Sequence, residues 1–203
     1  MTTLLVDTPH GPARASLHCA HEPRAALLLG HGAGGGVEAP DLVAACRAAN
    51  SVGVHVALIE QPYRVAGRRT PAPAGQLDTA WMAVVEDLGE RWFDGLPLVF
   101  GGRSSGARVA CRTSVEGQAV AVLCLAFPVH PPGKPEKSRM AELDGVEVAT
   151  LVVQGENDPF GQPEVAHHRE VVLLKGDHSL KASVADVGRY VGEWMDRVLR
   201  PLD

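Results

Sequence analysis

The sequence has few aromatic side chains and no long apolar run. Among its 203 residues, Phe, Trp and Tyr make up only 4%. No stretch approaches the roughly 18 consecutive apolar residues that a transmembrane helix needs. Residues 1–7 lack the basic start and the continuous apolar segment of a signal peptide. We therefore expect a cytoplasmic protein that does not interact with a membrane.

An excess of positive charge and a paired cysteine motif are also absent. The net charge of −5 argues against a nucleic-acid-binding surface, because a phosphate backbone requires a basic face. The four cysteines form no C-x-x-C pair and have no metal-ligand spacing. Three of them stand in apolar segments, where a thiol packs as a small core side chain. We expect reduced thiols, no metal, no cofactor and no nucleic-acid partner, and the sequence leaves the oligomeric state open.

Apolar strands alternate with amphipathic helices along the chain. Strands that are apolar along their whole length are typical of a parallel sheet covered by helices on both faces. Because the sequence contains no internal repeat and no linker, we expect one α/β domain over residues 1–203. Strands are expected at 13–18, 25–30, 54–60, 96–101, 119–127, 150–155 and 170–174, and helices at 41–50, 77–91, 105–115 and 183–199.

The segment GRSSG, residues 102–106, lies between an expected strand and an expected helix. It fits G-x-S-x-G with Ser104 at the centre, a pattern in which a sharp turn strains the serine and crowds its neighbours, so glycine is needed two places away on each side. Centring the pattern on Ser105 would put Arg103 and Ala107 at the crowded positions. Ser104 is therefore the candidate nucleophile, and the backbone N–H of Ser105 is one candidate oxyanion donor. A glycine-lined turn capped by serines is the non-catalytic alternative.

A second glycine-rich segment, GHGAGG at residues 30–35, has two functional interpretations. It fits G-x-G-x-x-G after a strand, and Glu60 ends the next strand, which is the outline of a dinucleotide-binding unit. Against this, Pro40 would fall inside a helix that must begin within the glycines, and Glu60 lies about 30 residues beyond the first glycine instead of about 20. The segment fits better as an oxyanion loop in which Ala33 or Gly34 supplies a second backbone N–H. A plain flexible turn is the remaining alternative.

A carboxylate and a histidine follow two later strands, as a serine nucleophile requires. A hydroxyl is a weak nucleophile unless a base takes its proton and a carboxylate orients that base. Asp158 and Glu156 both follow the same expected strand, and Asp158 is preferred because the proline and glycine after it fix a turn. His178 follows the last expected strand and is the candidate base. Its neighbour Asp177 is assigned to the turn.

Four segments carry a resemblance to a known family: GHGAGG, GGRSSGAR, FPVHPPGKPEK and QGENDPFG. The sequence resembles the α/β-hydrolase superfamily over nearly its whole length. Within it, the sequence is similar to the small dienelactone-hydrolase-like branch, which includes testis-expressed-protein-30-like proteins and relatives of a non-catalytic subunit of a histone acetyltransferase complex. The resemblance implies an α/β-hydrolase fold, with a mainly parallel sheet of about seven or eight strands and helices on both faces. It also implies a triad, which falls on Ser104, Asp158 and His178.

The segment after the strand expected at 119–127 leaves no room for a cap domain. A Pro-rich loop and one helical turn lead directly to the next strand, so we expect an open, shallow site for small or flexible acyl groups. The candidate pocket residues are His31 in the glycine-rich loop, Tyr63 and Arg64 in a basic loop, and His130 in the Pro-rich loop. A solvated basic loop and a histidine that fixes the Pro-rich loop are the structural alternatives.

Together these residues predict a serine hydrolase of small carboxylic ester or thioester substrates, which forms an acyl-enzyme on Ser104. Arg103, beside the nucleophile, is expected to be a structural ion-pair partner. A hydrolase fold that binds other proteins with little or no turnover is the first alternative, and a dinucleotide-binding protein is the second. Esterase, thioesterase and peptidase chemistry share these residues, so the triad predicts the type of reaction and leaves the acyl group open.

Overall fold

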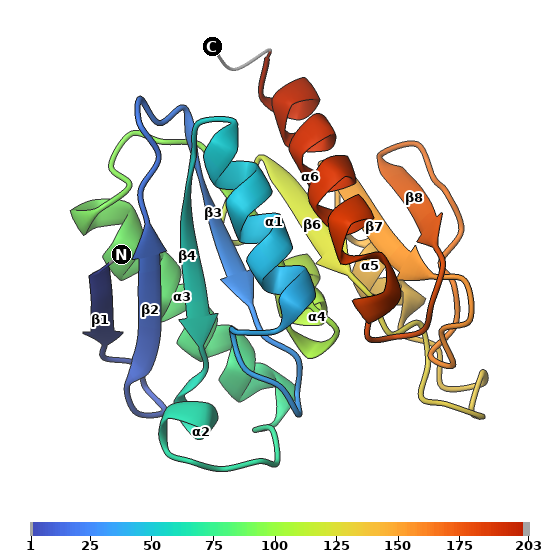
Figure 1. The fold of residues 1–203 in the computed structure, drawn as a ribbon. Coiled ribbons are helices and arrows are strands. Elements are labelled where there is room, and N and C mark those ends of the chain that lie inside the picture. Colours follow the sequence, from blue (N-terminus) through green and yellow to red (C-terminus); the bar gives the residue numbers. More distant parts are fainter. Residues whose placement is uncertain (1, 201–203) are drawn as a thin grey trace.

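The computed structural model describes residues 2–200, which form one central sheet with helices on both faces (Figure 1). The strands are β1 (Thr2–Val6), β2 (Ala13–His18), β3 (Ala25–Gly30), β4 (Val54–Glu60), β5 (Leu98–Arg103), β6 (Ala121–Leu125), β7 (Ala149–Gly155) and β8 (Arg169–Leu174). Their order in the sheet is β1-β2-β4-β3-β5-β6-β7-β8. β2 pairs antiparallel with β1 and β4, and all other pairs are parallel. The predicted mainly parallel α/β architecture is confirmed.

The helices form two layers, one on each face of the sheet. α1 (Pro40–Ser51) and α6 (Val184–Leu199) pack against each other on the face turned toward the viewer in Figure 1. The other face carries α3 (Ala74–Arg91), α4 (Ser105–Thr113) and α5 (Met140–Asp144). Two short elements, α2 (Pro62–Val65) and the 3₁₀ turn η1 (Lys181–Ser183), lie in connections. Helices on both faces explain why the central strands are apolar on both of their sides.

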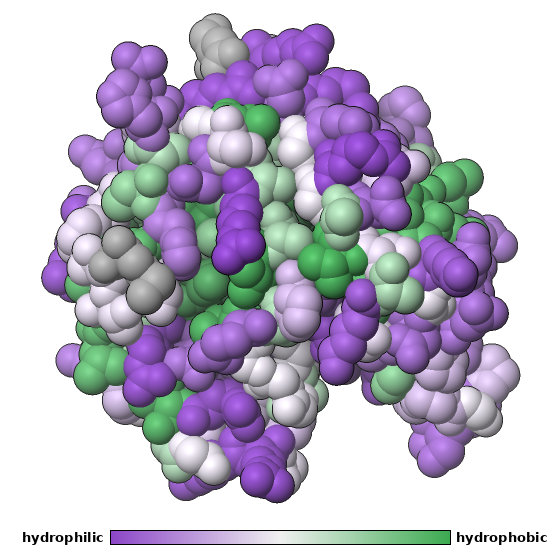
Figure 2. Space-filling model, viewed as in Figure 1, coloured by the Kyte–Doolittle hydropathy of each residue, from purple (hydrophilic) through white to green (hydrophobic). Residues whose placement is uncertain are grey.

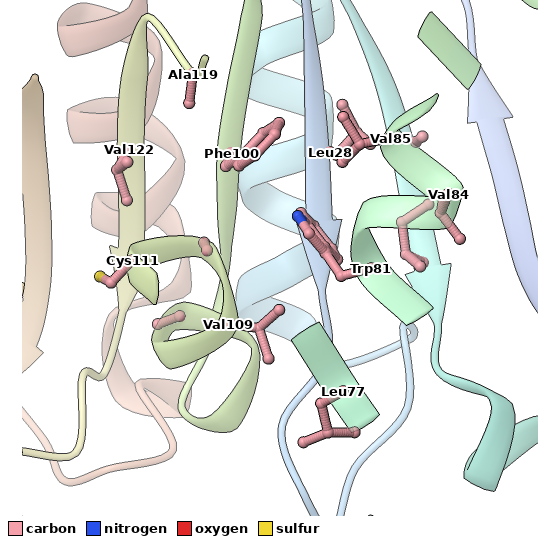
Figure 3. Packing of buried hydrophobic residues seen from close by; sticks show 14 of the residues in the cluster. Leu28, Leu77, Trp81, Val84, Val85, Phe100, Val109, Cys111, Ala119 and Val122 are labelled. Carbon is pink, nitrogen blue, oxygen red and sulfur yellow. The ribbon is translucent and has the colours of Figure 1, made fainter. Parts of the chain in front are cut away.

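Each layer buries an apolar stripe against the sheet. On the face covered by α3 and α4, the Trp81 ring meets the edge of Phe100 with ring centroids 5.7 Å apart, and Leu28 lies beside them (Figure 3). On the opposite face, Trp194 of α6 and Leu42 of α1 belong to a second buried cluster. Fully burying an aliphatic or aromatic side chain of this size contributes about 1.5–3 kcal/mol, so both clusters hold the helices firmly on the sheet.

The parallel strands place their carboxyl ends along one edge of the molecule, the lower edge in Figure 1. β3 and β5 are neighbours there, and Gly30 at the end of β3 is paired with Gly102 of β5. The space-filling view shows this edge hollowed between two lobes (Figure 2). In open α/β sheets, ligands bind in the crevice at the carboxyl ends of the strands. The loops that carry the predicted site residues therefore converge on the expected edge.

Three short elements, β1, α2 and η1, were not expected from the sequence. β1 has no apolar alternation and is mostly exposed at the edge of the sheet, so its pairing with β2 makes it a strand. α2 is a single turn that begins at Pro62, which is too short to show a helical period. As expected, three of the four cysteines are buried: Cys46, Cys111 and Cys124. Within residues 2–200, no helix is both long and apolar enough to cross a bilayer.

Candidate active site

The turn from β5 to α4 holds Ser104 in a strained backbone conformation. Its φ of 51° and ψ of −108° are rare for a residue with a Cβ, and such strain costs of order 1–3 kcal/mol. A Cβ on Gly102 would lie 2.5 Å from the carbonyl carbon of Gly106, and a Cβ on Gly106 would overlap the carbonyl oxygen of Gly30. The glycine pattern of the sequence is therefore required by the close approach of β3, β5 and α4.

The Ser104 side chain meets two residues from loops that are distant in the sequence. Nε2 of His178 lies 2.9 Å from Oγ of Ser104, although the two residues are 74 positions apart. Nδ1 of the same ring lies 2.8 Å from Oδ2 of Asp158. Asp158 follows β7 and His178 follows β8. The structure thus brings together the serine, the acid and the base that the sequence singled out.

The hydrogen-bond partners determine which nitrogen of His178 carries the proton. A carboxylate can only accept, so Nδ1 donates to Asp158 and the lone pair of Nε2 is free to accept the Ser104 hydroxyl. A ring in this tautomer can take the hydroxyl proton as the oxygen attacks, and the carboxylate stabilises the imidazolium that forms. The Asp158 side chain is fully shielded from solvent, which strengthens that interaction.

Asp158 is held in place by two donors of its own. Nε2 of Gln154 donates to Oδ2 at 2.8 Å, and the backbone N–H of Phe160 donates to Oδ1 at 2.8 Å. The Phe160 ring also stacks on the His178 ring with centroids 4.1 Å apart, which holds the plane of the imidazole. Glu156, the other candidate acid, is exposed at the start of the same turn. The acid that contacts the histidine is therefore Asp158.

Two charged neighbours of the triad have structural partners, as expected. Nε of Arg103 donates to Oδ2 of Asp41 at 2.9 Å, and Nη2 donates to the backbone carbonyl of His178 at 2.9 Å. The Asp177 carboxylate accepts hydrogen bonds from the backbone N–H and the hydroxyl of Ser179. Arg103 is thus an ion-pair partner and Asp177 belongs to the turn before α6.

The glycine-rich loop, residues 31–39, lies beside the nucleophile. A Cβ added to Gly32 would come 3.6 Å from Cβ of Ser104, so Gly32 lies close to the serine. α1 begins at Pro40, after the loop, and not within the glycines. A dinucleotide-binding unit needs the helix N-terminus inside the glycine motif, where it faces the pyrophosphate. The loop therefore has the arrangement of an oxyanion loop and lacks that of a dinucleotide site.

Three backbone N–H groups, one next to Ser104 and two in the glycine-rich loop, are available to a ligand. The N–H groups of Ala33, Gly34 and Ser105 have no acceptor among the residues that the structure describes. Ser105 is the first residue of α4, where N–H groups have no partner within the helix. A developing oxyanion would satisfy them, because such groups stabilise negative charge without reorganising. These are the three N–H groups that the sequence offered as oxyanion donors, and that role stays a prediction.

His31 and Tyr63, which were predicted as pocket residues, have their polar atoms directed at the backbone. A carbonyl can only accept, so Nδ1 of His31 donates to the oxygen of Gly32 at 2.8 Å, and Nε2 accepts the N–H of Gln61 at 3.1 Å. Burial lowers the pKa of His31, which favours the neutral ring that these partners require. The Tyr63 hydroxyl donates to the carbonyl oxygen of Ala33 at 3.0 Å. Both side chains therefore donate hydrogen bonds to backbone carbonyls of the glycine-rich loop.

The other two predicted pocket residues are Arg64 in α2 and His130 in the Pro-rich loop. Nε of Arg64 is buried and has no hydrogen-bond partner within residues 2–200. Nδ1 of His130 donates to the carbonyl of Pro131 at 2.9 Å, and its backbone N–H donates to the carbonyl of Phe160 at 3.0 Å. A Cβ on Gly161 would lie 2.7 Å from Nε2 of His130. His130 thus joins the Pro-rich loop to the turn that carries the acid, and a role in binding substrate stays a prediction for both residues.

Comparison with known families gives a match over most of the chain. Residues 23–199 match the family described as an alpha/beta hydrolase domain. The chain belongs to the α/β-hydrolase family. In α/β hydrolases the nucleophile stands on a strained strand-to-helix turn, and one oxyanion donor comes from the loop after the third strand. Ser104 and the loop after β3 occupy those places here.

Solved structures of the α/β-hydrolase fold are similar over nearly the whole chain. An alpha-beta serine hydrolase homologue from Coxiella burnetii gives a TM-score of 0.79 at 15% identity, covering 95% of this chain and 96% of that one. A serine hydrolase without a lid from Xanthomonas campestris gives 0.78 at 17% identity, covering 98% and 95%. A dienelactone hydrolase from Anabaena variabilis gives 0.78 at 17% identity, covering 98% of both chains. A search of curated proteins finds no sequence match, and at these identities the structural likeness shows the fold.

Two supporting residues of the site were not predicted. Gln154 is the last residue but one of β7 and is fully buried. A polar amide directly after the apolar run 151–153, four positions before the acid, is a sequence signal that could have marked it. Phe160 had no signal except its place after Asp158. Both act by fixing the acid and the imidazole, and their contacts depend on how the turn after β7 folds.

Proposed function

We propose that the protein is a serine hydrolase that cleaves small carboxylic ester or thioester substrates. The observation that carries the proposal is the continuous hydrogen-bonded series from Asp158 through His178 to Ser104. It ends beside backbone N–H groups that have no acceptor among the described residues. A hydroxyl, a correctly oriented base and oxyanion donors are the three parts that acyl transfer requires.

The reaction begins when Oγ of Ser104 attacks the substrate carbonyl carbon and Nε2 of His178 takes the hydroxyl proton. The carbonyl oxygen becomes negative and accepts hydrogen bonds from the N–H of Ser105 and an N–H of the glycine-rich loop. The bond to the leaving oxygen or sulfur then breaks, and the imidazolium gives its proton to that atom. Water then attacks the acyl carbon as Nε2 of the same histidine takes its proton. The second tetrahedral intermediate collapses, the bond from the acyl carbon to Oγ breaks, and the imidazolium returns its proton to Oγ, which releases a carboxylic acid and regenerates Ser104.

The connection between β6 and α5 favours a small or flexible acyl group. Only residues 126–139 lie between these elements, so no cap domain is inserted there. The hollow at the carboxyl edge of the sheet is open in the space-filling view (Figure 2). One structural relative is itself a serine hydrolase without a lid. A shallow site of this kind buries little of a long acyl chain and therefore discriminates weakly in favour of one.

Hydrolysis of p-nitrophenyl acetate by the wild type, Ser104→Ala and Ser51→Ala tests the proposal. Ser51 is an exposed serine at the end of α1, so its variant is a matched control for loss of a hydroxyl. We expect Ser104→Ala to lose at least about 10³-fold in kcat/KM and Ser51→Ala to keep wild-type rates. Equal rates for Ser104→Ala and the wild type would remove the nucleophile assignment.

Labelling with a fluorophosphonate probe separates the proposal from its alternative. Such a probe reacts with a serine that an adjacent base activates. We expect one labelled site, at Ser104, and no labelling of Ser104→Ala. A folded wild-type protein that neither reacts with the probe nor hydrolyses the ester would instead favour the alternative, a hydrolase fold used to bind other proteins.

A further inference from the structure

Tyr63 is a buried residue whose hydroxyl group contacts the backbone of the glycine-rich loop. It belongs to α2, where its backbone carbonyl accepts the N–H of Arg68 at 2.8 Å. The residue is 6% exposed, and its ring meets the edge of the His31 ring with centroids 5.7 Å apart. The hydroxyl donates to the carbonyl oxygen of Ala33 at 3.0 Å. The ring is therefore held by packing, and the hydroxyl has one defined acceptor.

Two peptide groups of the loop, Gly32–Ala33 and Ala33–Gly34, each accept a hydrogen bond at the carbonyl oxygen. The Gly32 oxygen accepts from Nδ1 of His31 and from the N–H of Gly35, and the Ala33 oxygen accepts from Tyr63. A trans peptide is planar, so its N–H points opposite to its C=O. Holding the Ala33 carbonyl toward Tyr63 thus directs the next N–H, that of Gly34, away from Tyr63 and from the protein interior.

The orientation of the Gly34 N–H depends on this hydrogen bond, because packing does not fix it. Gly34 is exposed, and a Cβ added there would meet no atom within 4 Å, so packing does not fix its peptide plane. Its N–H has no acceptor among the described residues. A glycine peptide is free to rotate unless something holds it, and a donor must be oriented in advance to stabilise an oxyanion. The Tyr63 hydroxyl is the only side-chain donor that the described residues place on this plane.

We propose that Tyr63 is a positioning residue that orients the Gly34 N–H as the second oxyanion donor, acting through the Ala33 carbonyl. The inference rests on the proposed hydrolase function. Burial raises the pKa of Tyr63, so the phenol keeps the proton that it donates. Tyr63 does not touch the substrate in this arrangement, which replaces the direct substrate contact expected from the sequence.

Tyr63→Phe removes the hydroxyl and keeps the ring, and Tyr190→Phe is the matched control. Tyr190 is the only other tyrosine in the chain and lies on α6, where Arg189 covers its ring. We expect Tyr63→Phe to lower kcat about tenfold with KM changed less than twofold, because removing an oxyanion donor outright costs about 10²–10³. The inhibition constant of phenylboronic acid, which forms a tetrahedral adduct on the serine, should rise by the same factor. Tyr190→Phe should leave kcat, KM and inhibition unchanged.

A second variant separates positioning from a general effect on the fold. Gly34→Pro deletes the N–H that Tyr63 is inferred to orient, so kcat should fall at least as far as in Tyr63→Phe. Adding Tyr63→Phe to Gly34→Pro should then cause no further loss. A further loss in the double variant, or wild-type kcat in Tyr63→Phe, overturns the inference while the hydrolase function stands. A wild-type protein without turnover overturns both.

Discussion

The guanidinium of Arg103 donates a 2.9 Å hydrogen bond to the backbone carbonyl of His178, 75 residues further along the chain. Its Nε donates to Asp41, which is 1% exposed near the start of α1. Arg103 thus links the turn at Ser104, the loop that carries His178 and the helix that follows the glycine-rich loop. Burial raises the pKa of Asp41 even though Arg103 acts to lower it, so the carboxylate depends on this partner.

Replacing Arg103 by Met should destabilise the fold and slow the reaction. Asp41 would remain buried without its cation, and we expect the free energy of unfolding to fall by about 3 kcal/mol. The double variant Arg103→Met/Asp41→Asn should recover part of that loss, because the buried charge is gone. Urea unfolding measures stability, and ester hydrolysis below the midpoint of unfolding measures kcat. If the free energy of unfolding of Arg103→Met lay within about 1 kcal/mol of the wild-type value, Asp41 would not depend on Arg103.

Asp158→Asn should reduce kcat by about 10⁴, because an amide cannot hold His178 in the tautomer that accepts the serine proton. Glu156→Gln is the matched control, since Glu156 is exposed two positions earlier in the same turn. Its activity should stay within about twofold of the wild type. Steady-state hydrolysis by the two variants measures both effects. The reverse ranking would assign the acid to Glu156 and contradict the geometry.

Gly102→Ala should damage the fold at the turn. Its Cβ would lie 2.5 Å from the carbonyl carbon of Gly106, and neither backbone segment can move without disturbing the sheet. We expect a loss of about 3 kcal/mol or more, or a failure to accumulate folded protein. Gly89→Ala is the control, because a Cβ in α3 meets nothing within 4 Å and should stabilise the helix by about 0.5–1 kcal/mol. Thermal unfolding compares the two, and equal midpoints would show that the turn tolerates a side chain.

Stability should decrease on acidification, in part through His31. Burial lowers its pKa below the value of 6.5 that applies when the chain is unfolded, so the unfolded state binds the proton more readily. Its contribution is therefore fully present above that value and is lost as the pH falls through the lowered pKa. We expect His31→Gln to show a weaker dependence of unfolding free energy on pH between about 7 and 5 than the wild type.

The control for this experiment is His167→Gln, which alters an exposed histidine. Burial also lowers the pKa of His18 and His55, and both remain in all three proteins, so their contribution to the slope cancels in the comparison. Urea unfolding at several pH values measures the slope. An unchanged slope in His31→Gln would show that His31 is not a source of the acid sensitivity.

The sequence was sufficient for most of the strands and long helices along the chain and for the glycine-flanked turn at Ser104. The strands expected at 13–18, 25–30 and 54–60 are those observed, because a buried strand shows as a short apolar run bounded by turn residues. α1 begins at Pro40, where proline is tolerated in the first turn of a helix. These features depend on neighbours within a few residues, so a local pattern contains the information.

Only the tertiary structure decided which groups meet. The sequence left Glu156 as a second acid and Tyr63 as one of several possible pocket residues. The folded chain turns Asp158 toward His178 and the Tyr63 hydroxyl toward Ala33. Each of these contacts joins segments 20 or 30 positions apart. The register of the parallel strands and the course of the loops after them set the distance between such segments. Neither leaves a periodic signal in the sequence, because both follow from how the helices pack on the two faces of the sheet.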